Sequence, residues 1–166
     1  PSIEDFSEIK NTCQKDKLGD ASISLFGCYT NSKIYIYGIS QDVLPGAIES
    51  TSAQELLHAV WARLDNSERR NLSSTLLSVF NESEPAFQKD INVIYSEDDK
   101  IEEIYTRAAT QLETLPDILE AHYSRVFTNR TDVVKHYKSY AKIFDSIEQK
   151  LTKLSDELTT LQTDIN

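Results

Sequence analysis

The residues best suited to chemistry are Gln54, Glu55 and His58, in the string Gln-Glu-Leu-Leu-His. In a helix, positions 54 and 58 lie one turn apart on one face, where two histidines can bind one zinc ion. The zinc motif H-E-x-x-H has this spacing, and its glutamate activates a metal-bound water. Here Gln54 replaces the first histidine, and a neutral amide oxygen is a weaker zinc ligand than imidazole. We therefore expect zinc to bind weakly or not at all.

Two ordinary roles could also account for these residues. Ser52 and Glu55 are spaced as a capping box at the start of a helix expected from Ser52 to Leu64. His58 lies one turn before Trp61 on that helix and would be partly buried there with or without a ligand. The string alone therefore does not distinguish a metal site from a structural helix.

The surrounding segments that must position this string are a strand and several helices. Lys33 to Ile39 is β-branched and aromatic with no helical period, which predicts a strand. Asp65-Asn66-Ser67 ends the motif helix and can cap a second one. Further helices are expected from Lys100 to Leu112 and from Pro116 to Phe127. The predicted fold class is α+β and mostly α, with a short sheet and a motif helix.

Two further elements are expected in the predicted globular domain, residues 1–131. Ile3, Phe6 and Ile9 recur every three residues, which predicts a short helix leading to Cys13. A second, weaker strand is expected at 91–95, between a proline and an acidic run.

The last segment, residues 132–166, has apolar side chains at alternating spacings of four and three, the heptad pattern of a coiled coil. We expect a helix roughly 50 Å long. Its partner could be an identical chain, another helix folding back as a hairpin, or another protein; alternatively the helix lies along its own domain. The stripe begins at Val133, Tyr137 and Tyr140, and the predicted oligomerisation seam is Phe144, Ile147, Leu151, Leu154, Leu158, Leu161 and Ile165.

The charge of the chain limits its partners. Acidic residues outnumber basic ones 27 to 17, giving a net charge of -10. Such a chain repels phosphate backbones and anionic bilayers, so we expect no nucleic-acid partner. No run of 18 or more apolar residues is present. We expect membrane attachment only through an anchor outside this sequence.

Cys13 and Cys28 are separated by a polar stretch rich in Lys, Asp and Gly. A disulfide between them would close this stretch as a loop and would indicate an oxidising compartment. Two buried free thiols in a cytosolic protein are the alternative.

Five stretches of the chain also match the pattern of a known family: Phe26–Thr30, Lys33–Tyr37, Thr51–Leu64, Glu103–Gln111 and Leu115–Tyr123. Together they resemble bacterial extracytoplasmic, membrane-anchored zinc metallopeptidases of zincin-like fold, over roughly Cys13 to Tyr140. The resemblance implies zinc in active relatives and weak or no zinc here. It also implies an extracytoplasmic, membrane-anchored full-length protein.

The resemblance assigns roles to individual residues. Glu55 would be the general base, while His58 and Glu103 would be metal ligands beside the degenerate position Gln54. Glu102 is almost as good a candidate for the acidic ligand, and a solvated first-turn glutamate is the plain alternative for Glu103.

The same family places a strand beside the active-site cleft. Tyr35, Ile36 and Tyr37 would form this edge strand and hold an extended peptide by β-augmentation.

These observations leave three functions open. The first is a pseudopeptidase, catalytically impaired, that acts in protein or peptide binding or scaffolding. The second is an active zinc endopeptidase in which Gln54 is a tolerated or introduced replacement of histidine. The third is a coiled-coil structural protein capped by a globular domain.

Overall fold

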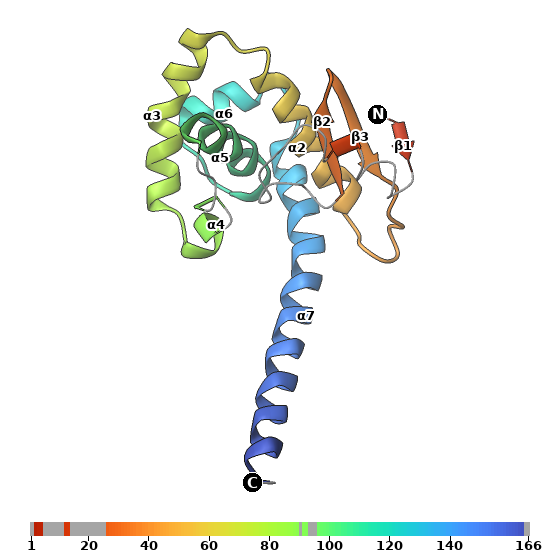
Figure 1. Ribbon diagram of the computed structural model, residues 1–166. Coiled ribbons are helices and arrows are strands. Elements are labelled where there is room, and N and C mark those ends of the chain that lie inside the picture. The colour runs from red at the N-terminus through yellow and green to blue at the C-terminus, as the bar shows by residue number, and fades with distance from the viewer. Residues whose placement is uncertain (1, 5–11, 14–25, 90, 93–95, 165–166) are drawn as a thin grey trace.

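The computed structural model describes residues 2–4, 12–13, 26–89, 91–92 and 96–164 of the chain. A group of packed helices lies on one side, a small sheet on the other, and one long helix projects from between them (Figure 1). The predicted fold class, α+β and mostly α, is confirmed. The helices are α2 (Ala47–Trp61), α3 (Asn66–Glu82), α4 (Pro85–Lys89), α5 (Glu97–Gln111), α6 (Asp117–Tyr123) and α7 (Arg130–Asp164).

The sheet contains β1 (Ser2–Glu4), β2 (Gly27–Thr30) and β3 (Lys33–Tyr37) in the order β1-β3-β2. β2 and β3 form an antiparallel hairpin, and Asn31 and Ser32 between them have the positive φ angles, 50° and 60°, that tight hairpin turns require. The predicted strand is therefore confirmed.

The predicted edge position of Tyr35, Ile36 and Tyr37 is wrong, because β3 is the central strand. Its other side pairs in parallel with β1, with Ser2 opposite Tyr35 and Glu4 opposite Tyr37. The expected helix at the N-terminus is also wrong over 2–4, which form this strand, while 5–11 lie outside the described residues. Pairing with the sheet overrides the three-residue apolar spacing there.

The motif helix α2 starts earlier than its sequence suggests. Its N-cap is Gly46, which has a φ of 85° and no side chain to cap the helix. A Cβ at Gly46 would lie 2.4 Å from the backbone oxygen of His136, so α7 passes too close for any other residue. Ser52 and Glu55 consequently lie inside the helix, and the predicted capping box is wrong.

The next helix, α3, begins as predicted. The Asp65 side chain accepts hydrogen bonds from the backbone of Ser67 and Glu68, and the Glu68 side chain accepts one from the backbone of Asp65. This reciprocal arrangement is a capping box. Ile91 and Asn92, where a second strand was expected to begin, form a turn, and 93–95 lie outside the described residues.

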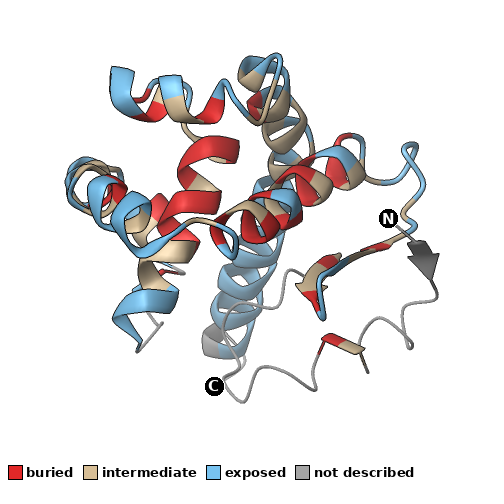
Figure 2. Ribbon diagram, turned by 90° about the horizontal axis from the view of Figure 1, so that it is seen from above, coloured by how far each residue is buried: buried red, intermediate tan, exposed pale blue. Residues whose placement is uncertain are grey.

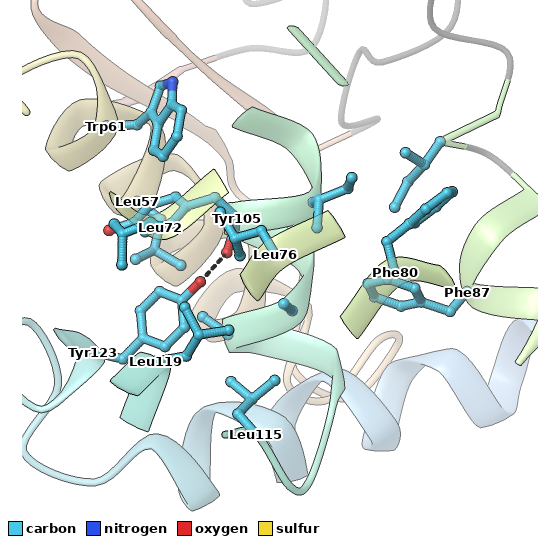
Figure 3. Close-up of a cluster of buried hydrophobic side chains, with 14 residues drawn as sticks. Leu57, Trp61, Leu72, Leu76, Phe80, Phe87, Tyr105, Leu115, Leu119 and Tyr123 are labelled. Carbon is cyan, nitrogen blue, oxygen red and sulfur yellow. Dashed lines mark hydrogen bonds between the residues drawn. The ribbon is translucent and has the colours of Figure 1, made fainter. Parts of the chain in front are cut away.

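The core is built around α5, which contacts α2, α3 and α7. Tyr105, Tyr123 and Leu76 are fully buried in it, and the Tyr123 hydroxyl donates to the Tyr105 carbonyl at 2.7 Å (Figure 3). Trp61, at the end of α2, packs against the Tyr105 ring at 4.9 Å between centroids. This core fixes how α2 and α5 face one another.

The long helix α7 belongs to two environments. Its first turns pack on α2 and α5, and Val134 is buried in the domain. Beyond Phe144 the helix extends away from the domain and is exposed (Figure 1, Figure 2). The long helix is therefore as predicted, but its first turns pack with the domain that was expected to end at residue 131.

Cys13 and Cys28 form a disulfide, which connects the segment at Cys13 to β2. Of the two alternatives left by the sequence, the bonded pair is the one present. No helix in the described part of the chain combines the length and the apolar character needed to traverse a bilayer.

Candidate functional site

The candidate site lies where α2 faces α5. From α2 come Gln54 and His58, one turn apart, and from α5 come Glu103 and Arg107, also one turn apart. Residues four apart share a helical face, so each helix presents its pair toward the other. The site is therefore formed by two rigid elements that the core holds in place.

His58 is the central side chain of this site. It is 8% exposed, with Nδ1 2.7 Å from Oε1 of Glu102 and Nε2 3.8 Å from Oε2 of Glu103. The two carboxylates flank the ring, so each ring nitrogen faces a different one. A histidine held this way at Nδ1 presents Nε2 in a fixed direction, as in metal-binding histidines.

Glu103 is where the predicted ligands meet. Its side chain is almost completely buried, and Oε1 accepts a hydrogen bond from Gln54 Nε2 at 3.5 Å. Gln54, His58 and Glu103 therefore converge, as the metal-site hypothesis requires. The alternative of a solvated first-turn Glu103 is wrong, since α5 begins six residues earlier, at Glu97, and position 103 faces α2. Their role as metal ligands stays a prediction.

Arg107 supplies a positive charge within the site. Its Nε donates to Oε1 of Glu103 at 2.5 Å, and its side chain is 18% exposed. A buried carboxylate needs a compensating charge or several hydrogen bonds, and the guanidinium of Arg107 provides the charge for Glu103. Arg107 was not predicted from the sequence, although its position four residues after Glu103 places it on the same helical face.

Glu55, the predicted general base, is 3% exposed on the same helix. Burial by itself favours neutral His58, but the hydrogen bond to Glu102 and the charges of Glu55 and Glu103 outweigh it and raise the pKa of His58. The three carboxylates around this ring therefore favour its protonated form.

A tyrosine from α7 completes the site. The side chain of Ser50 and the charge of Arg107 both act to lower the pKa of the Tyr140 hydroxyl, but burial is the larger effect. Burial raises the pKa of Tyr140 to about 12, so it stays a neutral hydroxyl. The sequence placed Tyr140 in the heptad stripe but did not predict its effect on the site, because this depends on how α7 crosses α2.

Several features of the site disfavour binding of a zinc ion. Gln54 directs its amide N–H toward Glu103, and Arg107 already binds the same carboxylate. A proton favoured on His58 would also compete with a metal, because ligands must be deprotonated. Within the described ranges, no group of three or more His, Cys, Asp or Glu side chains is arranged to hold a metal ion.

Comparison with protein-family models, curated proteins and solved structures finds no match for this chain. The family resemblance therefore depends on the residues quoted for it, and the site's function is argued from its geometry.

Proposed function

We propose that this chain is a catalytically impaired, metallopeptidase-like domain that binds a protein or peptide outside the cytoplasm. The observation that carries this proposal is the convergence of Gln54, His58 and Glu103 between two packed helices. Their spacing is that of a two-helix zinc site in which an amide replaces the first imidazole. Replacing one of three protein ligands weakens zinc binding severely.

The charges in the site favour complete loss of zinc binding over a reduced zinc affinity. A zinc ion would have offset the buried carboxylates, and here Arg107 offsets Glu103 while a proton on His58 faces Glu102. Because these two positive groups belong to the protein itself, the domain does not need a metal ion to stay folded. Glu55 then has no metal-bound water to deprotonate, which supports a non-catalytic role.

A surface hollow beside the sheet supports peptide binding. It has a volume of about 590 Å³ and lies between the β2–β3 hairpin and the outer face of α2. Tyr29, Ile34 and Leu56 provide apolar surface in it, and Lys33 and Arg63 add positive charge. Apolar surface beside two positive charges favours a peptide with acidic and apolar side chains.

The Cys13–Cys28 disulfide supports the extracytoplasmic assignment. Such bonds persist in oxidising compartments and are rare in the cytosol. Attachment to a membrane, through an anchor outside this sequence, is part of the same proposal and follows from the family resemblance.

The test is the zinc content and peptidase activity of the purified chain and of Gln54→His. We expect far less than one zinc ion per chain in the original and a clear rise in Gln54→His. Combining Gln54→His with Arg107→Gln should raise zinc binding further, because the competing guanidinium is removed. Gln149→His, on the exposed part of α7, is the matched control for an added histidine and should leave zinc unchanged.

Two outcomes would overturn the proposal. Stoichiometric zinc together with peptidase activity in the original chain would favour the active endopeptidase. Absence of zinc from every variant, with folding intact by circular dichroism, would exclude a metal-site ancestry and the family resemblance with it.

A further inference from the structure

The exposed part of α7 has an apolar seam that the described part of the chain does not cover. Six large side chains at heptad spacing are 40 to 61% exposed. They are Phe144, Ile147, Leu151, Leu154, Leu158 and Leu161. Ile165, the last residue of the predicted seam, lies outside the described residues. A continuous stripe of this kind marks an interaction surface rather than scattered surface residues.

The domain fixes the direction in which this seam faces. Tyr140 and Phe144 pack on the Phe26 ring, at 6.4 and 6.3 Å between centroids, so the stripe starts in contact with the domain. Beyond this contact α7 continues into solvent as one uninterrupted helix (Figure 1). The heptad spacing keeps the exposed stripe on one face of that helix. The seam therefore lies on a helix that is already formed, so pairing costs little conformational entropy of the backbone.

We propose that this seam pairs in antiparallel orientation with the same seam of a second copy of this chain. In the register favoured by the charges, Leu151 lies opposite Leu154 of the second copy, and Phe144 lies opposite Leu161. The paired segment is about 26 Å long, at a rise of roughly 1.5 Å per residue. The two globular domains then lie at opposite ends of the paired helices. This inference does not depend on the state of the Gln54 site.

The charged residues that flank the seam determine the orientation. With Phe144, Leu151 and Leu158 at the first position of the heptad, Lys150 and Glu157 occupy its last position. Residues at this last position face one another in an antiparallel pair. Lys150 of each copy then faces Glu157 of the other, and two-fold symmetry makes this contact twice. In a parallel pair, Lys150 would instead face Ser155 and Glu157 would face Gln162, with no opposite charges joined.

Sedimentation of the whole chain at increasing concentration tests the pairing. We expect a monomer–dimer equilibrium that Leu154→Asp abolishes and Thr152→Asp, on the opposite face of α7, leaves intact. Circular dichroism checks that both variants stay folded, since both positions are exposed. A monomer at every concentration would overturn the proposal.

Charge reversal tests the orientation. Lys150→Glu or Glu157→Lys alone should raise the dimer dissociation constant about tenfold, and the double variant should restore it. Asp156→Lys is the matched control, because Asp156 is exposed on the face of α7 opposite the seam. Failure of the double variant to restore dimerisation would contradict the antiparallel register.

Cysteine crosslinking gives an independent result. Cys13 and Cys28 are bonded to each other, so Leu151→Cys and Leu154→Cys each add one free thiol. Under mild oxidation, an equal mixture of the two variants should form a disulfide between a Leu151→Cys chain and a Leu154→Cys chain. Neither variant by itself should form much disulfide-linked dimer. Efficient crosslinking of each variant with itself would indicate a parallel pair and overturn the proposal.

Discussion

The 2.7 Å contact between Nδ1 of His58 and Oε1 of Glu102 determines which ring nitrogen faces the centre of the candidate site. Because Nδ1 is engaged, Nε2 points toward Glu103, 3.8 Å away. Adjacent residues of α5 thus have different roles: Glu102 orients the imidazole, and Glu103 meets the residues of α2. The sequence offered the two glutamates as alternatives, and the structure uses both.

The protonation of His58 should make stability depend on pH. Burial opposes the charged ring, but the hydrogen bond to Glu102 and the neighbouring carboxylates raise its pKa above the ordinary 6.5. A group with a raised pKa in the folded state stabilises fully below its unfolded pKa and loses that contribution as pH rises through the folded pKa. Glu102→Gln should therefore destabilise more at about pH 5.5 than at about pH 9.

Urea unfolding of the original chain and Glu102→Gln at both pH values measures this difference. Ring-proton NMR provides the direct reading, with His122 as an internal reference: its pKa is lowered by burial and by the charge of Arg125. His58 should titrate above His122, and Glu102→Gln should bring the two closer. An unchanged His58 titration in that variant would contradict the assigned contact.

Gly46→Ala should destabilise the domain by roughly 2–4 kcal/mol. The φ of 85° disfavours any side chain, and the added Cβ would lie 2.4 Å from the His136 backbone oxygen. The clash should separate α7 from the start of α2. Chemical unfolding measures the loss, and Gly38→Ala, at an exposed position, should cost much less.

Arg130→Met should cost about 2–3 kcal/mol, because one guanidinium joins three segments. Its side chain is 8% exposed, forms an ion pair with Glu120 on α6, and donates to the carbonyls of Leu112 and Glu113 after α5. Loss of these bonds leaves carbonyl groups without a donor at the end of α5. Arg70→Met, at an exposed position on α3, is the control and should change the unfolding free energy little.

Local patterns in the sequence were the most reliable guides to this fold. The Asp65 cap depends on side chains within three residues, and the heptad stripe of α7 depends on spacing alone, so both were predictable. The start of α2 was not, because Gly46 is required by the passage of α7, ninety positions further along the chain. The N-terminal strand was missed for a similar reason: Ser2–Glu4 is a strand only through its pairing with β3.

In the candidate site, too, some features have a local sequence signal and others depend on how the helices pack. Helical spacing placed Gln54 and His58 on one face, but the choice between Glu102 and Glu103 depends on the rotation of α5 against α2. Sequence spacing contains no such information, so only the family resemblance pointed to Glu103. The electrostatic interaction of Tyr140 with Arg107 depends on the packing of α7 and has no local signal in the sequence.

The Cys13–Cys28 disulfide should contribute about 3 kcal/mol to stability, as expected for closing a loop of fifteen residues. The bond restricts the unfolded chain, and it also connects the segment at Cys13 to β2, against which α2 packs. Replacing both cysteines with alanine should therefore lower the unfolding free energy, and a reductant should do the same to the original chain. The reductant should have no effect on the double variant, which is the control. Equal stability of the oxidised, reduced and substituted proteins in urea would show that the loop contributes nothing to the fold.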